Sequence, residues 1–217
     1  MNTFRFVPEG WNEEVENLNL QKIQEYKEEN KIVQGIVQSC DEQYNLHIQL
    51  GNEIEGIIPR CEVEDIQEGE PDERLCTGKV HKYVQFKINN IEKDNTVLLS
   101  RKSVQQEALQ YIKNDMQVGQ HVIGIVKNIR PYGAFIEIGG GVVGLAHIED
   151  LSVARIKTPY ERLKIGQKVK VVVKSIDRYT GKVNLSYKET LGTWEENAEK
   201  FSTGMKVEGI IRETEKN

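Results

Sequence analysis

Two aromatic residues, Tyr132 and Phe135, stand three positions apart beside basic residues, in a segment that reads PYGAFIEIG. Ala134, Ile136 and Ile138 alternate with Phe135, so a strand of period two turns Phe135 away from the apolar residues. An exposed aromatic pair beside cations suits a flat ligand, and an unstacked nucleobase is such a ligand. The pattern therefore predicts base stacking, with packing against the edge of a core as the alternative for both rings.

Two strands and a turn must position this pair. Gly139-Gly140-Gly141 breaks the first strand, and Val142–His147 returns as its partner. A later strand with Val169, Val171 and Val173 on one face carries basic residues on the other, namely Lys168, Lys170 and Lys174. We interpret these lysines as a phosphate track, with a solvated face as the alternative. The apolar phase shifts after this strand, which predicts a bulge that re-aims Asp177.

Several motifs follow one another in a recognisable order between about residues 119 and 188: YGAF, GGG, GLAH, KIGQKVKVVVKSID and VNLSYK. Together they resemble the S-one RNA-binding domain family, which is named after a bacterial small-subunit ribosomal protein. The resemblance implies a five-stranded oligonucleotide-binding barrel with RNA across its second and third strands. The chain as a whole resembles the N-terminal part of that ribosomal protein or a close homologue.

The resemblance also implies five RNA-contacting positions in this chain. They are the stacking residues Tyr132 and Phe135, His147 at the end of a strand, Asp177, and the basic residue Lys182. A lone histidine after an apolar strand, such as His147, is as often a structural residue as a ligand-binding one. Asp177 could orient a neighbouring donor or accept a bond from a base. Lys182 replaces the arginine common at its position and lacks the planar fork, so Arg178 is a candidate substitute.

The chain repeats itself. IVQGIVQSC (32–40), HVIGIVKNI (121–129) and KVEGIIRET (206–214) share a central glycine, at Gly35, Gly124 and Gly209. We therefore predict an all-β tandem of five-stranded barrels joined by short helical linkers. The expected parts are an arm and short helix (1–29, with the helix over Leu18–Glu29), a degenerate barrel (30–102), a helical linker (103–115), an RNA-binding barrel (116–188), a helical connector (189–201) and the start of a truncated third repeat (202–217).

The first repeat differs at the positions that matter. Tyr44 matches Tyr132, but His47 stands in place of Phe135 and Pro59 in place of His147. Its segment from 62 to 73 is dense in acidic residues, which would repel RNA. We expect this repeat to dock a protein or to act as a spacer, and the family resemblance points to the small ribosomal subunit as the partner of residues 30–102.

Charge is divided between the repeats. The net charge is −5, but residues 1–120 carry 13 Lys/Arg against 22 Asp/Glu, and residues 121–188 carry 12 against 5. The positive charge therefore lies on the same segment as the aromatic pair, where a polyanion would bind.

Several classes of protein are disfavoured. The chain has no apolar run of roughly 18 residues, no signal-type start, and three cysteines without a CxxC pair, so we expect a cytoplasmic, membrane-independent protein. It has no phosphate loop, no HExxH and no metal-spaced Cys/His cluster, so we expect no enzyme, cofactor, metal or small-molecule substrate.

The predicted function is non-catalytic binding of single-stranded RNA, holding messenger RNA at the small ribosomal subunit. Two alternatives stay open: an RNA-binding appendage of a ribonuclease or phosphorylase, and a protein-docking scaffold. Since KVEGIIRET resembles only a first strand, we expect the chain to be a piece of a longer protein.

Overall fold

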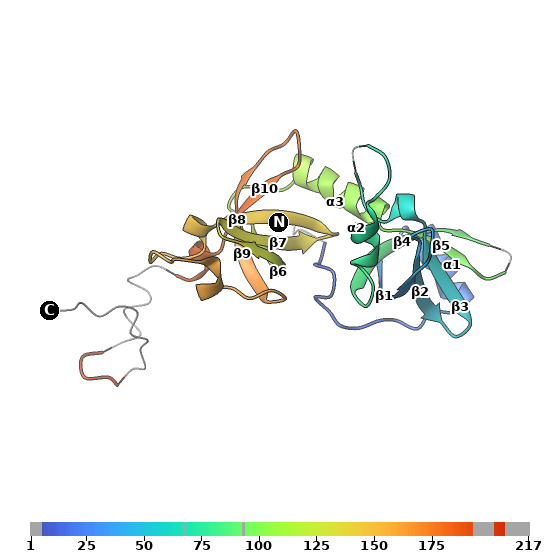
Figure 1. The fold of residues 1–217 in the computed structure, drawn as a ribbon, viewed down its shortest axis with the longest axis horizontal. Coiled ribbons are helices and arrows are strands. Elements are labelled where there is room, and N and C mark those ends of the chain that lie inside the picture. The colour runs from blue at the N-terminus through green and yellow to red at the C-terminus, as the bar shows by residue number, and fades with distance from the viewer. Residues whose placement is uncertain (1–5, 67, 93, 193–201, 207–217) are drawn as a thin grey trace.

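The fold was described from a computed structural model, which describes residues 6–66, 68–92, 94–192 and 202–206. Two closed five-stranded barrels lie side by side along the long axis of the molecule (Figure 1). The first has the strand order β1-β2-β3-β5-β4, with β1 Val33–Cys40, β2 Leu46–Gly51, β3 Ile54–Ile58, β4 Tyr83–Ile91 and β5 Val97–Ser100. The second has the order β6-β7-β8-β10-β9, with β6 His121–Arg130, β7 Gly133–Gly139, β8 Val142–His147, β9 Lys168–Ile176 and β10 Val183–Ser186.

The two barrels close in the same way because their first strands are built alike. Gly35 and Gly124 lie in the middle of β1 and β6, where a side chain would collide with the barrel interior. A Cβ at Gly124 would lie 2.4 Å from Ile136 Cγ2, and one at Gly35 would lie 2.7 Å from Ile48 Cγ2. Each strand also has a register shift two to four residues further on, between 37 and 39 in β1 and between 126 and 128 in β6. Such bulges bend a long strand so that it pairs on both of its edges.

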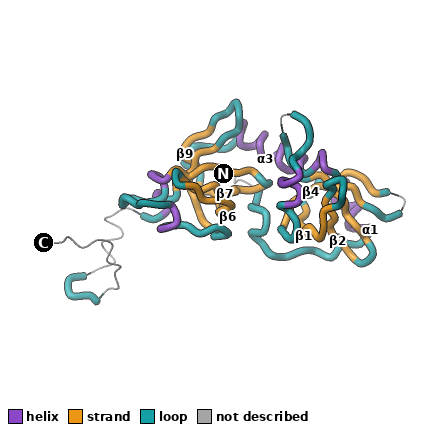
Figure 2. Tube along the Cα trace, in the orientation of Figure 1, coloured by secondary structure: helices purple, strands orange, loops and turns teal. Residues whose placement is uncertain are grey.

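Helices lie only at the periphery of the barrels (Figure 2). They are α1 Leu20–Glu28, α2 Glu73–Thr77 and α3 Lys102–Asn114, with short 3-10 turns at Arg60–Glu62, Ile148–Asp150, Pro159–Glu161 and Lys188–Thr190. The helix predicted over Leu18–Glu29 is confirmed, but it begins at Leu20 because the Asn19 side chain caps it by accepting from the Lys22 N–H, 2.9 Å away. The predicted linker helix is α3. Helix α2 is not among the predicted elements.

Each barrel has its own core. Leu18 and Ile23 join the first core from outside the barrel, whereas Val104, Ala108 and Ile112 of α3 join the second. The all-β tandem of five-stranded barrels predicted from the repeats is therefore confirmed. No helix in the described part of the chain is long and apolar enough to cross a membrane. Of the predicted helical connector (189–201) and third-repeat start (202–217), residues 193–201 and 207–217 lie outside the described residues.

Candidate nucleic-acid interface

Strand β7 presents the aromatic pair as its alternation predicts. Ala134, Ile136 and Ile138 are fully buried, while Phe135 is only half-buried on the outer face. Tyr132, in the turn before β7, has 50% of its surface exposed. The two rings meet edge to face, with centroids 6.1 Å apart and planes at 82°. This arrangement leaves ring surface open on the outside of the barrel, as base stacking requires.

The strand register shows what lies beside Phe135. Phe135 pairs with Leu145 of β8, and Leu145 pairs with Asn184 of β10. Asn184 is exposed and its side-chain amide donates to Ser175 Oγ, 2.9 Å away. A row of an aromatic ring, an apolar side chain and an amide therefore crosses the outer face. The sequence analysis missed Leu145 and Asn184, although the alternation in GLAH and VNLS could have placed both on this face.

A second row lies one step along the strands and is centred on a buried glycine. Gly133 of β7 pairs with Arg130 of β6 on one side and with His147 of β8 on the other. Arg130 and His147 are both exposed. A Cβ at Gly133 would lie 2.5 Å from the Ala146 carbonyl oxygen, so β7 and β8 could not come together there with a larger residue. The exposed side chains of Arg130 and His147 therefore lie on either side of Gly133, beside the aromatic pair. Sequence reasoning had not singled out Arg130.

Asp177 organises its own loop. Its Oδ1 accepts from the Tyr179 N–H at 2.9 Å and the Thr180 N–H at 3.3 Å, and its Oδ2 accepts from Thr180 Oγ1 at 2.5 Å. The bonds from Thr180 and Tyr179 lower the pKa of the Asp177 carboxyl. The bulge expected at Asp177 was misplaced: the register shift falls at Lys174, between Val173 and Ser175. Lys182, at the far end of the loop, is exposed just before β10.

Arg178 belongs to a different part of the structure. Its guanidinium donates to the carbonyl oxygens of Ile112 at 2.7 Å, Lys113 at 3.0 Å and Met116 at 2.6 Å. The carbonyls of Ile112 and Lys113 are among those that the end of α3 leaves unpaired, and that of Met116 lies just beyond the helix. A cation there also complements the helix dipole. Arg178 is therefore a cap of α3, and we do not carry it forward as a substitute for Lys182.

The three lysines of β9 have unequal surroundings. Lys168 forms an ion pair with Glu13 at 3.2 Å and lies 5.9 Å from the ring centroid of Trp11. Lys174 donates to both oxygens of Asp150 at 2.8 Å, which raises its pKa. Lys170 is exposed, and among the described residues its ammonium makes no hydrogen bond or ion pair. Of the three lysines, Lys170 could therefore contact a phosphate without giving up an ion pair.

The first barrel has the same face with different chemistry. His47 takes the place of Phe135, and its two ring nitrogens lie 2.7 Å from Glu55 Oε1 and 3.2 Å from Asp41 Oδ2. Burial alone would lower the pKa of His47, but these two carboxylates raise it above its usual value. Tyr44 is covered by Arg60, whose guanidinium carbon lies 5.0 Å from its ring centroid. The polar groups of this face therefore bind one another.

Both barrels have the strand order 1-2-3-5-4, and the second presents aromatic, amide and basic groups on its second and third strands and their neighbours. This combination defines an oligonucleotide-binding fold. The S1 RNA binding domain family matches residues 26–102 and 115–188, and the chain belongs to this family.

Two relatives at the level of sequence share one name. The chain is 40% identical over 134 residues to the small ribosomal subunit protein bS1 of Staphylococcus aureus, which covers 59% of this chain and 34% of that protein. It is 33% identical over 144 residues to the protein of the same name from Rhizobium meliloti, covering 64% and 25%. The chain thus spans about a third or less of these relatives. Among solved structures, GSP13 from Bacillus subtilis is 32% identical, with a TM-score of 0.35, and covers 36% of this chain and 61% of that one.

Proposed function

We propose that the second barrel binds single-stranded RNA across the outer face of β7, β8 and β10. The observation that carries the proposal is the edge-to-face pair of exposed Tyr132 and half-buried Phe135, beside a strand whose other face fills the core. Bases would stack on these rings, and the adjoining row of Leu145 and Asn184 would supply an apolar contact and a hydrogen-bonding edge.

Charge supports RNA over other flat ligands. Residues 121–188 carry 12 Lys/Arg against 5 Asp/Glu, and Arg130, Lys170 and Lys182 are exposed. Of these, Arg130 lies in the row through Gly133 beside the aromatic pair. His147 adds a ring that can stack or donate a hydrogen bond. The proposed role is binding without catalysis. Among the described residues no group of three or more His, Cys, Asp or Glu side chains could hold a metal ion.

We further propose a division of labour between the repeats. The first, residues 30–102, attaches the protein to a protein partner at the small ribosomal subunit, and the second, residues 116–188, holds messenger RNA there. The names of the relatives support the ribosomal setting. The paired His47 and the acidic segment around α2 support a first barrel that leaves RNA to its neighbour.

The test is binding of a short fluorescently labelled single-stranded RNA to the whole chain, followed by anisotropy. Phe135→Ala should weaken binding by roughly 1–3 kcal/mol, the usual loss for one stacking platform. Phe135→Leu should lose nearly as much, because leucine keeps the apolar contact with Leu145 but offers no ring.

The matched control is Leu75→Ala. Leu75 is an exposed apolar residue of α2 in the first barrel, 42% exposed, and its loss should leave RNA affinity unchanged. If both Phe135 variants keep the wild-type fold by circular dichroism and bind RNA as wild type does, the site lies elsewhere.

A further inference from the structure

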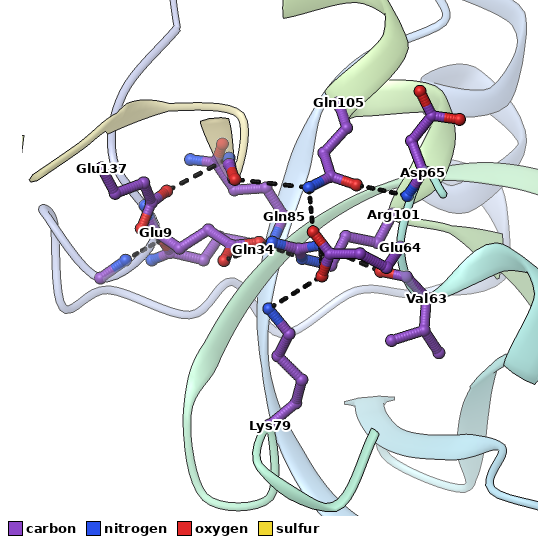
Figure 3. A network of polar contacts seen from close by, with 12 residues as sticks. Glu9, Gln34, Val63, Glu64, Asp65, Lys79, Gln85, Arg101, Gln105 and Glu137 are labelled. Atoms are coloured by element: carbon purple, nitrogen blue, oxygen red, sulfur yellow. Dashed lines mark hydrogen bonds and ion pairs between the residues drawn. The ribbon is translucent and has the colours of Figure 1, made fainter. Parts of the chain in front are cut away.

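A network of buried polar side chains lies at the junction between the two barrels (Figure 3). Its members come from segments far apart in the sequence, and each is at most 8% exposed: Glu9, Gln85, Arg101, Gln105 and Glu137. Charged groups stay buried only where they are paired and hydrogen-bonded. The network therefore fixes the geometry of the elements that contribute to it.

Glu9 contacts both barrels at once. Its carboxylate accepts from Arg101 Nε at 2.7 Å, from Arg101 Nη2 at 3.1 Å and from the backbone N–H of Gln85 in β4 at 3.1 Å. Its own backbone N–H donates to Glu137 Oε1 in β7, 2.8 Å away. A two-pronged contact between a guanidinium and a carboxylate is directional as well as strong. One residue thus joins the first barrel, the start of α3 and the second barrel.

Arg101 extends the network into the first barrel. Its Nη1 donates to Glu64 Oε2 and to the Val63 carbonyl oxygen, each at 2.9 Å. Burial alone would lower the pKa of Arg101, but the charges of Glu9 and Glu64 raise it above its usual value, so the guanidinium stays charged. On the other side, Lys127 pairs with Glu137 Oε2 at 2.7 Å. Arg101 and Glu9 therefore face groups of opposite charge, whereas burial and the charge of Glu9 raise the pKa of the Glu137 carboxyl in spite of Lys127.

The segment that contains Glu9 is anchored in both cores. Phe6 is 2% exposed in the core of the second barrel, where its ring meets Tyr111 of α3 edge to face at 6.3 Å. Leu18 is 3% exposed in the core of the first barrel, and its N–H donates to the Leu50 carbonyl oxygen at 2.7 Å. Between these anchors, Gln34 holds the segment by accepting from the Gly10 N–H at 2.9 Å.

The barrels are consequently connected twice. In Figure 1, α3 joins them along the top of the view, and the N-terminal segment joins them along the bottom. A single connection leaves two domains free to swing about it, and modest interfaces between domains permit such motion. A second connection on another side removes that freedom, since motion about α3 would pull Phe6 or Leu18 out of a core.

We propose that residues 6–18 form an intramolecular strap that fastens the two barrels into one rigid unit, and that its hold on the second barrel needs both Phe6 and Glu9. The strap holds the face of β7 that carries Phe135 at a fixed angle to the first barrel. Glu137, the residue that Glu9 contacts in β7, lies two positions from Phe135 on the same strand. The inference does not depend on what the second barrel binds.

Residual dipolar couplings of backbone amides in the whole chain test the strap. In the wild type, one alignment tensor should fit the couplings of both barrels. In the double variant Phe6→Ala/Glu9→Ala, each barrel should need its own tensor, while amide chemical shifts show that its strands are intact. Glu13→Gln is the control: the Glu13 carboxylate forms an exposed ion pair with Lys168, so one tensor should still fit.

Phe6→Ala alone is a second variant, since it leaves Arg101 paired with Glu9 and so spares the first barrel. It should also separate the two tensors. A wild type that needs two tensors overturns the strap outright. So does one shared tensor in both the double variant and Phe6→Ala, because α3 alone would then suffice to hold the barrels.

Discussion

At the scale of single residues, Arg130 and Arg178 have the same charge and opposite surroundings. Arg178 donates to three carbonyl oxygens at the end of α3, so its bonds are already made. Arg130 is exposed in the row that runs through Gly133 to His147, beside the aromatic pair. A guanidinium that donates to backbone carbonyls, as in Arg178, stabilises the fold. An exposed guanidinium beside a binding face, as in Arg130, can bind a phosphate.

We therefore predict opposite results for the two alanine variants. Arg178→Ala should lower the free energy of unfolding by about 1.5 kcal/mol, because α3 loses charge-assisted bonds to its last carbonyls, and should leave RNA affinity unchanged. Arg130→Ala should leave stability within about 0.5 kcal/mol. It should reduce the slope of log affinity against log salt by about 0.7, the value for one phosphate contact to a single strand. Urea unfolding and RNA titration at several salt concentrations measure both; a reversed pattern would reverse the two assignments.

His47 gives the first barrel a dependence on pH. Since Glu55 and Asp41 raise its pKa above 6.5, the folded barrel holds this proton more tightly than the unfolded chain does. Its contribution to stability is therefore fully present below pH 6.5 and is lost as pH rises through the folded-state pKa. We predict that the urea midpoint of the wild type falls relative to that of His47→Gln as pH increases over this range. His121→Gln, at an exposed position of the second barrel, is the control and should track the wild type.

At the scale of elements, the two interior glycines of β1 and β6 are the clearest shared device. Gly124→Ala would place a Cβ 2.4 Å from Ile136 Cγ2 and 3.0 Å from the Glu137 carbonyl oxygen, and Gly35→Ala would place one 2.7 Å from Ile48 Cγ2. Each should destabilise its own barrel by roughly 1–3 kcal/mol through overpacking. Lys170→Ala, at an exposed position of β9, is the control for a strand substitution and should leave stability nearly unchanged. Thermal unfolding would contradict the prediction if both glycine variants melted as the wild type does.

Features that depend on local sequence patterns could be predicted. The outward Phe135 and the buried Ala134, Ile136 and Ile138 could be predicted because strand alternation is a local pattern. The sequence repeats predicted two barrels because corresponding strands carry corresponding residues. The family resemblance added the candidate positions in loops, where periodicity says nothing.

The partners of charged side chains could not be predicted in this way. Arg178 bonds to carbonyls more than 60 residues earlier in the chain, and Lys168 pairs with Glu13, 155 positions away. Nothing in the local sequence distinguishes these cations from Lys170 or Arg130, since only the packing of α3 and of the N-terminal segment onto the barrels brings the partners together. The segment 1–17 itself has no period, so the sequence suggested a plain arm, although Phe6 and Glu9 are among its most buried residues.

At the scale of the whole molecule, charge is arranged unevenly along a rigid frame. The first 120 residues are acidic and residues 121–188 are basic, so an approaching polyanion is drawn toward the second barrel and repelled by the first. With the strap in place, this difference in charge has a fixed direction relative to the face that carries Phe135. RNA would therefore arrive in one preferred orientation, and a partner of the first barrel would stay clear of its path.

The strap and the proposed RNA site together predict how ligand binding spreads through the molecule. A ligand that binds only the folded state stabilises it by RT ln(1 + [L]/Kd), about 2.7 kcal/mol at a free concentration of 100 Kd. If the barrels unfold as one unit, RNA on the second barrel must shift the melting of the first as well.

We predict a single thermal transition in the wild type, raised by RNA. In Phe6→Ala/Glu9→Ala we predict two transitions, of which only that of the second barrel responds to RNA. Phe135→Ala should keep the single transition, and the same RNA concentration should raise it less than it raises the wild type. Calorimetry with and without RNA on these three proteins separates the two ideas: two transitions in the wild type would argue against the strap, and a single transition that RNA does not move would argue against the binding face.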